Sequence, residues 1–432
     1  MENNELDYQK IIVAHPGRQH SFRLAEALER HDMLFKYATT VYDSSNSFWM
    51  KLTKLFIHGD NLNRANKRKM TTVDDSKIVQ FCELLGLILL LVYRIDKSQR
   101  FARNFSKFVS NYFQRKLANY IIKNNIGIVI SYDCNSSLLF DILKEKAPKV
   151  IKIIDDAHPN RNYLYKVYND ILETAGEFAK TYQACGYLTD KECAEAFGDE
   201  SKKADLHIVA SHFSMNSVLF NGFKEDQIIL APYGVSNTSF KPTEKDYDQG
   251  LNVLFVGEVN QRKGIAQILE SARQLKINGC NDIEFNIVGG GADLCSELYE
   301  PYKSVVHFRG RVSFVDLQKY YGLSHIFVFP SVGEGFGLVI LEALAAGLPV
   351  ITSRNCGGPD VIQDGYNGFL IDAGNTEQLT EKILWFYQHK ELLPQMSNNA
   401  VQSVSQMTWE HYGDNLVKQL KEKINYLTKQ SK

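Results

Sequence analysis

The sequence predicts an α/β protein of two domains, each built around a parallel sheet. Its 432 residues exceed what one hydrophobic core usually serves and suit two domains of about 200 residues. The order apolar strand, glycine-containing loop, helix recurs near residues 11–30, 251–264 and 326–346. This alternation is typical of parallel sheets covered by helices. Because residues 236–250 are polar and rich in turn-forming residues, we place the domain boundary near residue 235.

The composition and charge argue against several classes of protein. Hydrophobic residues make up 44% of the chain and charged residues 23%, as in ordinary globular proteins. The net charge of −1 provides no overall attraction to nucleic acid or to membranes. Seven cysteines without a C-x-x-C pair argue against a disulfide framework or a zinc site. The N-terminus lacks the pattern of a secretory signal and the apolar run 84–93 is too short to span a bilayer, so we expect a cytoplasmic protein.

Residues 326–351 carry the clearest functional pattern. An apolar strand over 326–329 is followed by a loop with three glycines and by a helix predicted from Leu338. The N-terminus of a helix that follows a glycine-rich loop attracts anions, because side chains do not cover the backbone N–H groups and these groups point the same way as the helix dipole. Two carboxylates, Glu334 and Glu342, lie in this stretch. In a helix, eight residues would separate them by about 12 Å and turn them about 80° apart. A hydrolytic pair needs about 5–9.5 Å, so two separate hydrogen-bonding roles are favoured.

The stretch PSVGEGFGLVILEALAAGLPVI resembles the donor-site motif of family-4 retaining glycosyltransferases of the GT-B fold. The resemblance is close over residues 228–372 and loose over 1–227. It implies two Rossmann-like domains facing across a cleft: an acceptor domain, 1–234, and a donor domain, 235–409. The terminal helix, 410–432, would cross back to the first domain. The implied reaction moves a sugar, with retention, from a UDP- or GDP-sugar to an acceptor hydroxyl of a glycan or a lipid-linked molecule. Cell-surface polysaccharide or glycoconjugate synthesis is the implied setting.

The resemblance also implies roles for individual residues of the motif. Glu334 would contact the donor sugar, and Glu342 would hold the ribose hydroxyls. His158 follows the strand predicted over 150–154, and a histidine at a comparable place in the family lies close to the donor sugar and the leaving phosphate. The amides at the start of the helix would bind the diphosphate; they belong to Gly335, Phe336, Gly337 and Leu338.

A basic pair stands at another strand-to-helix turn. Arg262 and Lys263 precede Gly264, and neighbouring cations at such a turn suit a diphosphate. The family often places an arginine directly after the first glycine of this turn and a lysine before the second. Here Glu258 holds the first position, so Lys263 matches directly and Arg262 is expected to replace the missing arginine.

Further site residues are expected by position. The resemblance implies that Arg311 and Val312 lie near the nucleotide base. In the first domain, Gly17 follows a predicted strand and can bring backbone close to a ligand, and Arg18 and His20 are candidates beside it. No D-x-D motif stands in a loop after a strand, so we expect no metal and no cofactor besides the nucleotide sugar itself.

Residues 44–123 differ from the rest of the chain in charge. They contain 15 Lys and Arg against 5 Asp and Glu, a local net charge of +10. Phe101, Phe105, Phe108 and Tyr112 recur at the spacing of one helix face. A basic amphipathic helix of this kind can lie on the anionic inner face of a membrane. The alternative is that the aromatic stripe belongs to the core and the charges form its solvated side.

Two other functional classes remain open at this point. One is an enzyme that uses the same donor fold, either a sugar-nucleotide epimerase or a phosphorylase. The other is a non-catalytic subunit that binds a nucleotide sugar. The presence of Glu334, Glu342, Lys263 and His158 argues against the subunit. Nucleic acid is not an expected partner, since no nucleic-acid fold signature accompanies the basic region.

Overall fold

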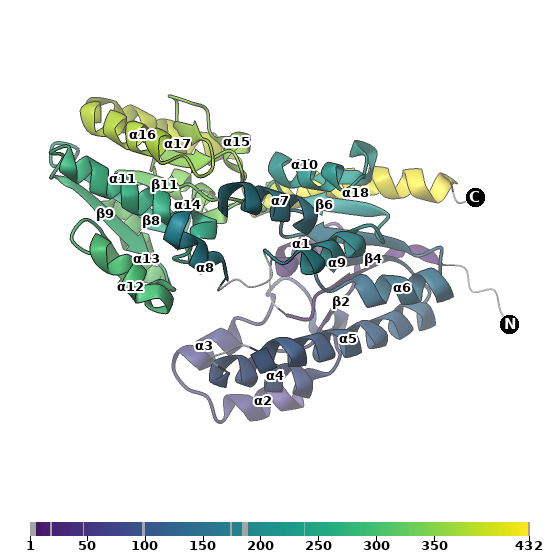
Figure 1. Cartoon of the computed structure of the whole chain (residues 1–432). Helices are drawn as coiled ribbons and strands as arrows, with labels where there is room; N and C mark the ends of the chain where they lie inside the picture. Colours follow the sequence, from purple (N-terminus) through teal and green to yellow (C-terminus); the bar gives the residue numbers. More distant parts are fainter. Residues whose placement is uncertain are drawn as a thin grey trace.

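The computed structural model describes residues 6–17, 20–45, 47–96, 100–172, 175–183, 189–236 and 238–430. It contains two parallel sheets covered by helices (Figure 1). The first has seven strands in the order β3-β2-β1-β4-β5-β6-β7, and the second has six in the order β10-β9-β8-β11-β12-β13. Every described pairing between these strands is parallel. The predicted α/β class with two parallel sheets is therefore confirmed.

The strands of the first sheet are β1 Asp7–Ala14, β2 Leu34–Thr39, β3 Ile78–Gln80, β4 Ile126–Tyr132, β5 Ile151–Asp156, β6 Leu206–Val209 and β7 Ile228–Leu230. Those of the second sheet are β8 Leu251–Val256, β9 Ile283–Val288, β10 His307–Gly310, β11 Ile326–Phe329, β12 Val350–Ser353 and β13 Gly368–Ile371. The predicted boundary near residue 235 falls between the two sets.

The helices up to residue 220 are α1 Ser21–Arg30, α2 Phe48–Lys54, α3 Asp60–Asn66, α4 Glu83–Ile95, α5 Arg100–Lys123, α6 Ser137–Lys146, α7 Arg161–Leu172, α8 Ala179–Gln183, α9 Lys191–Ser201 and α10 His212–Phe220. The later helices are α11 Ile265–Ile277, α12 Ser296–Tyr299, α13 Phe314–Leu323, α14 Leu338–Ala345, α15 Gly358–Val361, α16 Thr376–Gln388, α17 Leu393–Val404 and α18 Trp409–Gln430.

Both sheets reverse their strand order at one point. In the first sheet, β1 lies between β2 and β4, and in the second, β8 lies between β9 and β11. The central strands β4 and β11 are buried along their whole length, because helices cover both faces of each sheet. Ligands of open parallel sheets bind outside the carboxyl ends of the strands at such a reversal. We therefore expect a ligand-binding site among the loops that follow β1, β4, β8 and β11.

The terminal helix α18 returns to the first domain, as predicted. The yellow helix in Figure 1 contacts α1 and the edge strand β7, and an ion pair of 2.8 Å joins Asp414 to Arg30 of α1. A Cβ added at Gly413 would lie only 2.7 Å from the Cβ of Ala27, so the two helices approach closely at this glycine. Gln419 donates a hydrogen bond of 2.8 Å to the carbonyl of Leu230 at the end of β7.

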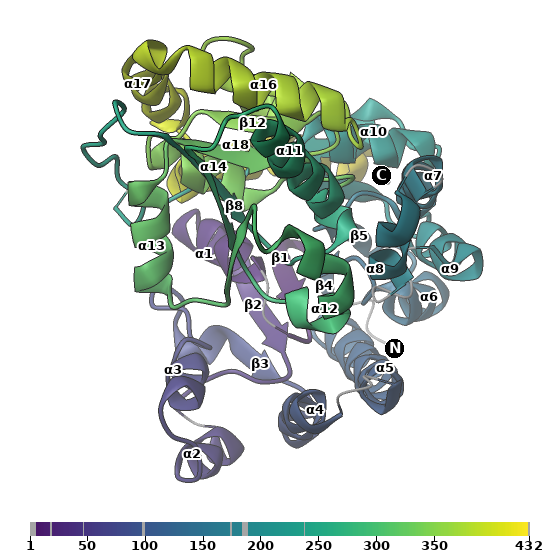
Figure 2. The same cartoon turned by 60° about the vertical axis from the view of Figure 1, so that its left-hand side comes forward.

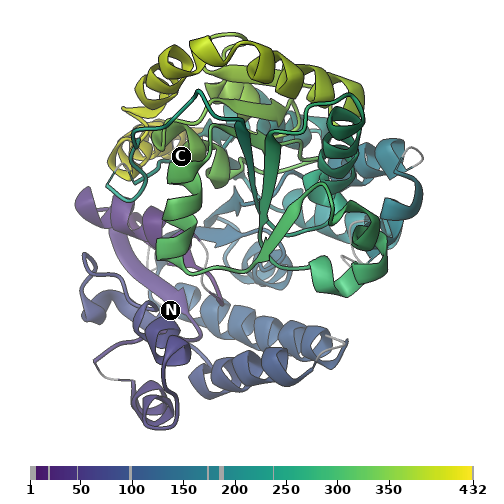
Figure 3. The ribbon, with the colours of Figure 1, turned by 90° about the vertical axis from the view of Figure 1, so that its left-hand side faces the viewer.

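Helices α2 to α5 form a separate lobe beside the first sheet, shown in blue below both sheets in Figures 2 and 3. Helix α5 buries Val109, Phe113 and Leu117, whereas Phe101 and Phe108 are 63% and 54% exposed. The aromatic stripe of α5 therefore lies outside the core, and the alternative that assigned it to the core is wrong. Within the described part of the chain, no helix is both long enough and apolar enough to cross a bilayer.

Candidate active site

The basic pair and the loop glutamate meet at the carboxyl ends of β8 and β11. Arg262 and Lys263 lie in a single helical turn whose N-terminus is capped by the side chain of Asn260. The Nη1 of Arg262 and the Nζ of Lys263 both contact Oε1 of Glu334, Lys263 at 2.5 Å. The side chains of Lys263 and Glu334 are only 12% and 13% exposed. Two cations thus share one buried carboxylate, and the cluster carries a formal charge of +1.

The charge state of this cluster follows from its burial and its ion pairs. Burial raises the pKa of Glu334, but the positive charges of Lys263 and Arg262 outweigh it and bring the pKa to about 2. Burial lowers the pKa of Lys263, against the opposite effect of Glu334. At neutral pH, Glu334 is therefore ionised. Such a preorganised positive site, shielded from water, stabilises negative charge on a ligand more strongly than it would in bulk solvent.

Backbone contacts lock the two loops of the cluster together. The carbonyl of Arg262 accepts hydrogen bonds from the amide of Val332 at 2.9 Å and from the hydroxyl of Ser331 at 3.0 Å. Gly264 has a φ of +73°, and a Cβ there would lie 2.1 Å from the carbonyl oxygen of Pro330. Only glycine fits this position without strain. The loop after β11 is consequently held in place by the turn that carries the basic pair.

The second glutamate occupies a different part of the site, on α14. This helix begins after Gly337, which has a φ of +89°, and the amides of residues 335–338 lie at its N-terminus. One turn into the helix, Glu342 accepts a hydrogen bond of 3.0 Å from the hydroxyl of Tyr321 on α13. Burial raises the pKa of Glu342, although the hydrogen bond from Tyr321 acts in the opposite direction. The structure thus gives the two glutamates different partners.

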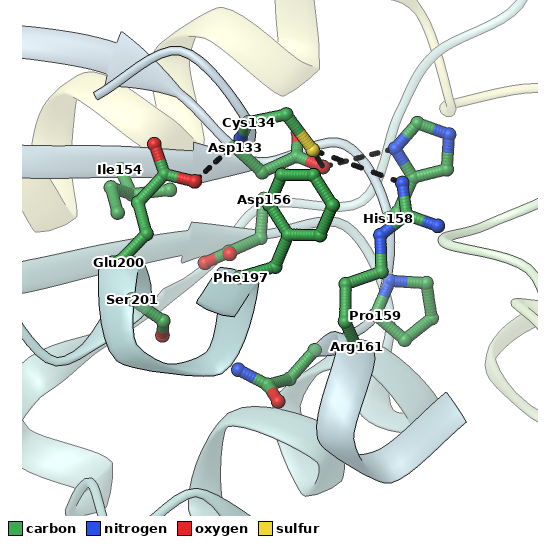
Figure 4. A pocket seen from close by; sticks show the side chains of 11 residues that line it. Asp133, Cys134, Ile154, Asp156, His158, Pro159, Arg161, Phe197, Glu200 and Ser201 are labelled. Atoms are coloured by element: carbon green, nitrogen blue, oxygen red, sulfur yellow. Dashed lines mark hydrogen bonds and ion pairs between the residues drawn. The ribbon is translucent and has the colours of Figure 1, made fainter. Parts of the chain in front are cut away.

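In the first domain, His158 is held by an aspartate. Its Nδ1 lies 3.1 Å from Oδ2 of Asp133, the residue directly after β4 (Figure 4). Burial raises the pKa of Asp133, but the positive charge of His158 and a hydrogen bond from it outweigh this and bring the pKa to about 2. Because the bond to Asp133 occupies Nδ1, it fixes the orientation of the ring and leaves Nε2 for a ligand.

A buried glutamate supports the turn that carries Asp133. Glu200, on α9, accepts backbone hydrogen bonds from Cys134 at 2.9 Å and from Ser137 at 2.8 Å. Figure 4 shows Glu200 reaching this turn from one side while His158 reaches it from the other. Burial raises the pKa of Glu200 to about 7. Its role is to position the turn, since its oxygens are engaged with the backbone.

The two halves of the site face each other across the domains. A Cβ added at Gly335 would lie 2.3 Å from the carbonyl oxygen of Ala157, the residue before His158. The carbonyl of Gly335 accepts hydrogen bonds from the hydroxyls of Ser211 and Ser214, the latter at 2.9 Å. The charge of His158 also contributes to lowering the pKa of Glu334. The loops that carry His158 and Glu334 are therefore neighbours, although they lie more than 170 residues apart in the sequence.

The remaining predicted residues lie around this centre. The amide of Gly17 donates to Nδ1 of His15 at 2.9 Å, so it is already used within its own loop. His20 lies 3.2 Å from Asp155, while Arg18 is outside the described residues. Arg311 and the half-buried Val312 follow β10. The buried Phe336 stacks over the backbone of Gly357, where an added Cβ would lie 2.7 Å from its ring.

Two residues of the site were not found from the sequence. Asp133 could have been identified, because it stands two residues after the apolar run 126–131, at the same sheet edge as His158. Tyr321 carries no local signal, since only the packing of α13 against α14 brings it to Glu342. Among the residues that the structure describes, no three His, Cys, Asp or Glu side chains are grouped as metal ligands would be.

Comparison with known proteins shows which family the second domain resembles. Residues 237–403 match the model of the family "Glycosyl transferases group 1". An uncharacterized glycosyltransferase of Methanocaldococcus jannaschii is 29% identical over 48% of this chain and 56% of its own length. The capsular polysaccharide biosynthesis glycosyltransferase CapM of Staphylococcus aureus is 26% identical over 48% of this chain and 59% of its own length.

A third relative, from Campylobacter jejuni, is N,N'-diacetylbacillosaminyl-diphospho-undecaprenol alpha-1,3-N-acetylgalactosaminyltransferase. It is 29% identical over 46% of this chain and 54% of its own length. The matches therefore span little more than half of these relatives.

Solved structures resemble the chain over nearly its whole length. Sucrose-phosphate synthase from Thermosynechococcus elongatus has a TM-score of 0.66 at 19% identity, covering 96% of this chain and 98% of its own. TarM has a TM-score of 0.63 at 13% identity, with the same coverage. At these identities the likeness concerns the fold alone, which is GT-B.

Proposed function

We propose that this chain is a glycosyltransferase, starting from the match of its residues 237–403 to the model of the family of glycosyl transferases group 1. The donor is a nucleoside diphosphate sugar and the acceptor is a hydroxyl group of a glycan or of a lipid-linked saccharide. The cluster of Arg262, Lys263 and Glu334, facing His158 across the domains, carries the proposal. The net positive charge of this cluster supports the binding of a diphosphate here.

The chemistry follows from the charges that develop. The bond between the anomeric carbon and the diphosphate oxygen breaks, while the acceptor oxygen bonds to the same carbon. Negative charge grows on the departing diphosphate, and Arg262 and Lys263 stabilise it. The amides at the N-terminus of α14 add to this effect through the helix dipole. The proton of the acceptor hydroxyl passes to the departing phosphate oxygen, because attack from the face of the leaving group brings the two oxygens together.

The carboxylates and His158 orient the donor in this scheme. Glu334 contacts the sugar and holds the two cations in place, and Glu342 accepts hydrogen bonds from the ribose hydroxyls. His158 contacts the sugar or the leaving phosphate through Nε2, which donates a hydrogen bond when the ring is the imidazolium. Arg311 and Val312 lie beside the base, and Gly17 approaches the cleft from the first domain. Since the cationic pair supplies the charge that a divalent metal would otherwise provide, transfer is expected to continue in a chelating buffer.

Titration calorimetry with a panel of UDP- and GDP-sugars, followed by a transfer assay, tests this function. A glycosyltransferase binds one nucleotide sugar and releases nucleoside diphosphate faster when an acceptor is added. An epimerase would convert the donor without an acceptor, and a phosphorylase would require phosphate. Binding without any turnover in the presence of acceptor extracts would indicate a non-catalytic subunit. The absence of binding to every nucleotide sugar would refute all of these functions.

The printed names of the relatives favour a role in cell-surface glycan synthesis. CapM is named for capsular polysaccharide biosynthesis, and the name of the Campylobacter enzyme specifies a saccharide linked through a diphosphate to a lipid. We propose the same setting for this chain, with retention at the transferred sugar. Identification of the anomeric configuration of the product by NMR spectroscopy tests the retention.

We also propose that the protein works at the cytoplasmic face of a membrane. The lobe of α2 to α5 lies in a region of net charge +10, and Phe101 and Phe108 are exposed on α5. Each Lys or Arg near an anionic surface contributes about 1 kcal/mol, so four or five engaged residues suffice for reversible attachment. Binding to vesicles should increase with anionic lipid and decrease with salt.

A matched pair of variants sharpens the vesicle experiment. Phe108→Asp should weaken sedimentation with anionic vesicles, because it places a negative charge on the exposed face of α5. Phe220→Asp, at a phenylalanine that is 53% exposed on α10 outside this lobe, should leave sedimentation unchanged. Equal binding by all three proteins, or no binding at any lipid composition, would contradict attachment through α5.

A further inference from the structure

A large cavity lies within the lobe of α2 to α5 and is not part of the proposed donor site. Its volume is about 590 Å³, and α2, α3 and α4 form most of its wall. Ligand sites usually measure about 300–1,000 Å³, so this cavity is large enough for a small organic molecule. Its wall is mainly apolar, with contributions from Phe56 and Ile57 and from Leu87 and Leu91 of α4.

Three arginines interrupt the apolar wall: Arg64 on α3, Arg94 on α4 and Arg68 between them. Arginine forms paired hydrogen bonds with phosphate oxygens, and an apolar wall beside it suits a hydrocarbon chain. Phe56 is 77% exposed and Leu91 56%, although an isolated soluble protein rarely exposes large apolar side chains next to one another. An amphiphile with an anionic end complements both features of the wall.

A smaller cavity lies beside this one, at the edge of the first sheet. It measures about 240 Å³ and shares Arg68, Leu90 and Tyr93 with the larger cavity. It is also lined by His15 and Gly17, in the loop after β1, and by Asn135, in the turn that carries Asp133. The wall of the smaller cavity therefore contains both Arg68 and the turn next to Asp133, which contacts His158 of the proposed active site.

His15, one of the residues that line this smaller cavity, carries a buried hydrogen-bond donor. The ring is 5% exposed, and its Nδ1 accepts a hydrogen bond from the amide of Gly17. Burial lowers the pKa of His15 to about 4, so the ring is neutral and its proton resides on Nε2. Among the residues that the structure describes, this buried Nε2 has no hydrogen-bond partner. A buried polar group without a partner requires an explanation, and a polar group of a ligand beside His15 would supply one.

We propose that the larger cavity binds the hydrocarbon chain of a lipid phosphate that carries the acceptor saccharide, and that Arg64, Arg68 and Arg94 hold its phosphate group. The smaller cavity then receives the saccharide and directs it to the cleft. The proposal rests on the proposed function and specifies its acceptor as a single lipid molecule bound within the lobe, as distinct from the bilayer surface around it.

Calorimetry with farnesyl diphosphate, in the absence of vesicles and donor, tests the proposal. The protein should bind this probe, and farnesol or inorganic pyrophosphate should bind at least about tenfold more weakly, because each lacks one of the two complementary parts. Leu91→Asp and the double variant Arg64→Gln/Arg94→Gln should each weaken binding by about tenfold or more. The thermal unfolding of each variant is recorded to confirm that it folds.

Two control variants separate the cavity from the general charge of the lobe. Phe220→Asp on α10 and Arg115→Gln on α5 change exposed residues outside the cavity wall and should alter binding less than about twofold. If the control and cavity variants lost affinity for farnesyl diphosphate equally, the probe would be adsorbing to the surface, and the proposal would be overturned. So would displacement of the probe by UDP, which would place it in the donor site. Probe binding without any binding of nucleotide sugars would instead refute the proposed function and leave the cavity as a lipid-phosphate site.

Discussion

At the scale of single residues, Glu334 determines how the donor half of the site is arranged. Its carboxylate lies between Arg262 and Lys263 and is ionised at neutral pH, because their charges lower its pKa to about 2 despite burial. Without it, two buried cations would face each other directly. Glu334 therefore serves two purposes in the proposed reaction: it contacts the sugar, and it keeps both cations oriented towards the diphosphate.

Replacement of Lys263 tests the role of this cluster. Lys263→Ala removes one charge-assisted contact to the diphosphate, worth about 1.5–3 kcal/mol, so donor turnover should decrease at least tenfold. Steady-state kinetics with the donor identified by calorimetry provide the measurement. Lys319→Ala, which changes an exposed lysine of α13 with a side-chain exposure of 66%, should leave turnover unchanged. Unaltered kinetics in Lys263→Ala would show that the diphosphate is bound elsewhere.

Replacement of Glu342 tests whether the two glutamates have different roles. Glu342→Gln keeps the shape of the side chain but removes the charge that favours the ribose hydroxyls. We expect the affinities for the free nucleoside diphosphate and for the nucleotide sugar to decrease in parallel, as measured by calorimetry. A loss confined to the nucleotide sugar would mean that Glu342 contacts the sugar and that the roles of the two glutamates are reversed.

At the scale of elements, the loop between β11 and α14 joins the two domains. Its residue Gly335 abuts Ala157, and its carbonyl accepts hydrogen bonds from two serines of the first domain. The same loop is held to the turn of Arg262 by two hydrogen bonds. One short segment thereby sets the position of Glu334 relative to both the basic pair and His158.

The close approach at Gly335 predicts a strong effect of a single methyl group. Gly335→Ala would place a Cβ 2.3 Å from the carbonyl oxygen of Ala157, so the domains must move apart there. We expect at least a tenfold loss of kcat, because displacement of catalytic groups by about 1 Å is costly. Gly322→Ala, where the nearest atom lies 3.4 Å away, is the control. Equal activity of both variants would show that this contact does not position the site.

At the scale of the whole molecule, buried carboxylates make stability depend on pH. Burial raises the pKa of Glu200 from its ordinary value of 4.5 to about 7 and that of Asp156 from 3.8 to about 6. A raised pKa means that the fold favours the protonated form. The stabilisation associated with these groups is therefore complete below the unfolded pKa values and is lost as the pH rises towards 6–7.

Glu200→Gln should remove one part of this dependence. For wild-type Glu200, the free energy of unfolding should decrease by about 2–3 kcal/mol between pH 5 and pH 8. This corresponds to about 1.4 kcal/mol for each pH unit between pH 5 and the raised pKa of about 7. The difference in free energy of unfolding between variant and wild type, measured with denaturant, should therefore change by this amount in favour of the variant as the pH rises from 5 to 8. Glu195→Gln, at an exposed residue of the same helix, should follow wild type. A constant difference between Glu200→Gln and wild type would exclude a titrating Glu200.

Much of the fold could be predicted from the sequence because its signals are local. The strand over 326–329 and the helix beginning at Leu338 occur where the apolar runs and glycines indicated, since strand and helix periodicity depend on neighbouring residues. The same holds for the start of α18 at Trp409. The motif that contains Glu334 and Glu342 was likewise complete within one stretch of chain, so the two carboxylates could be selected before the structure was known.

The partners of these residues depended on the tertiary structure. Lys263 and Glu334 are separated by 71 residues, and Asp133 and His158 by 25, so no local pattern contains either pair. The aromatic stripe of α5 shows the same limit: helical periodicity groups Phe101 with Phe108 but does not reveal which face is covered. Only the packing of α5 through Val109 and Phe113 leaves that stripe exposed. A local sequence pattern determines where a strand, a helix or a motif residue occurs. Which side chains are buried and which form ion pairs is decided only when segments distant in the sequence come together.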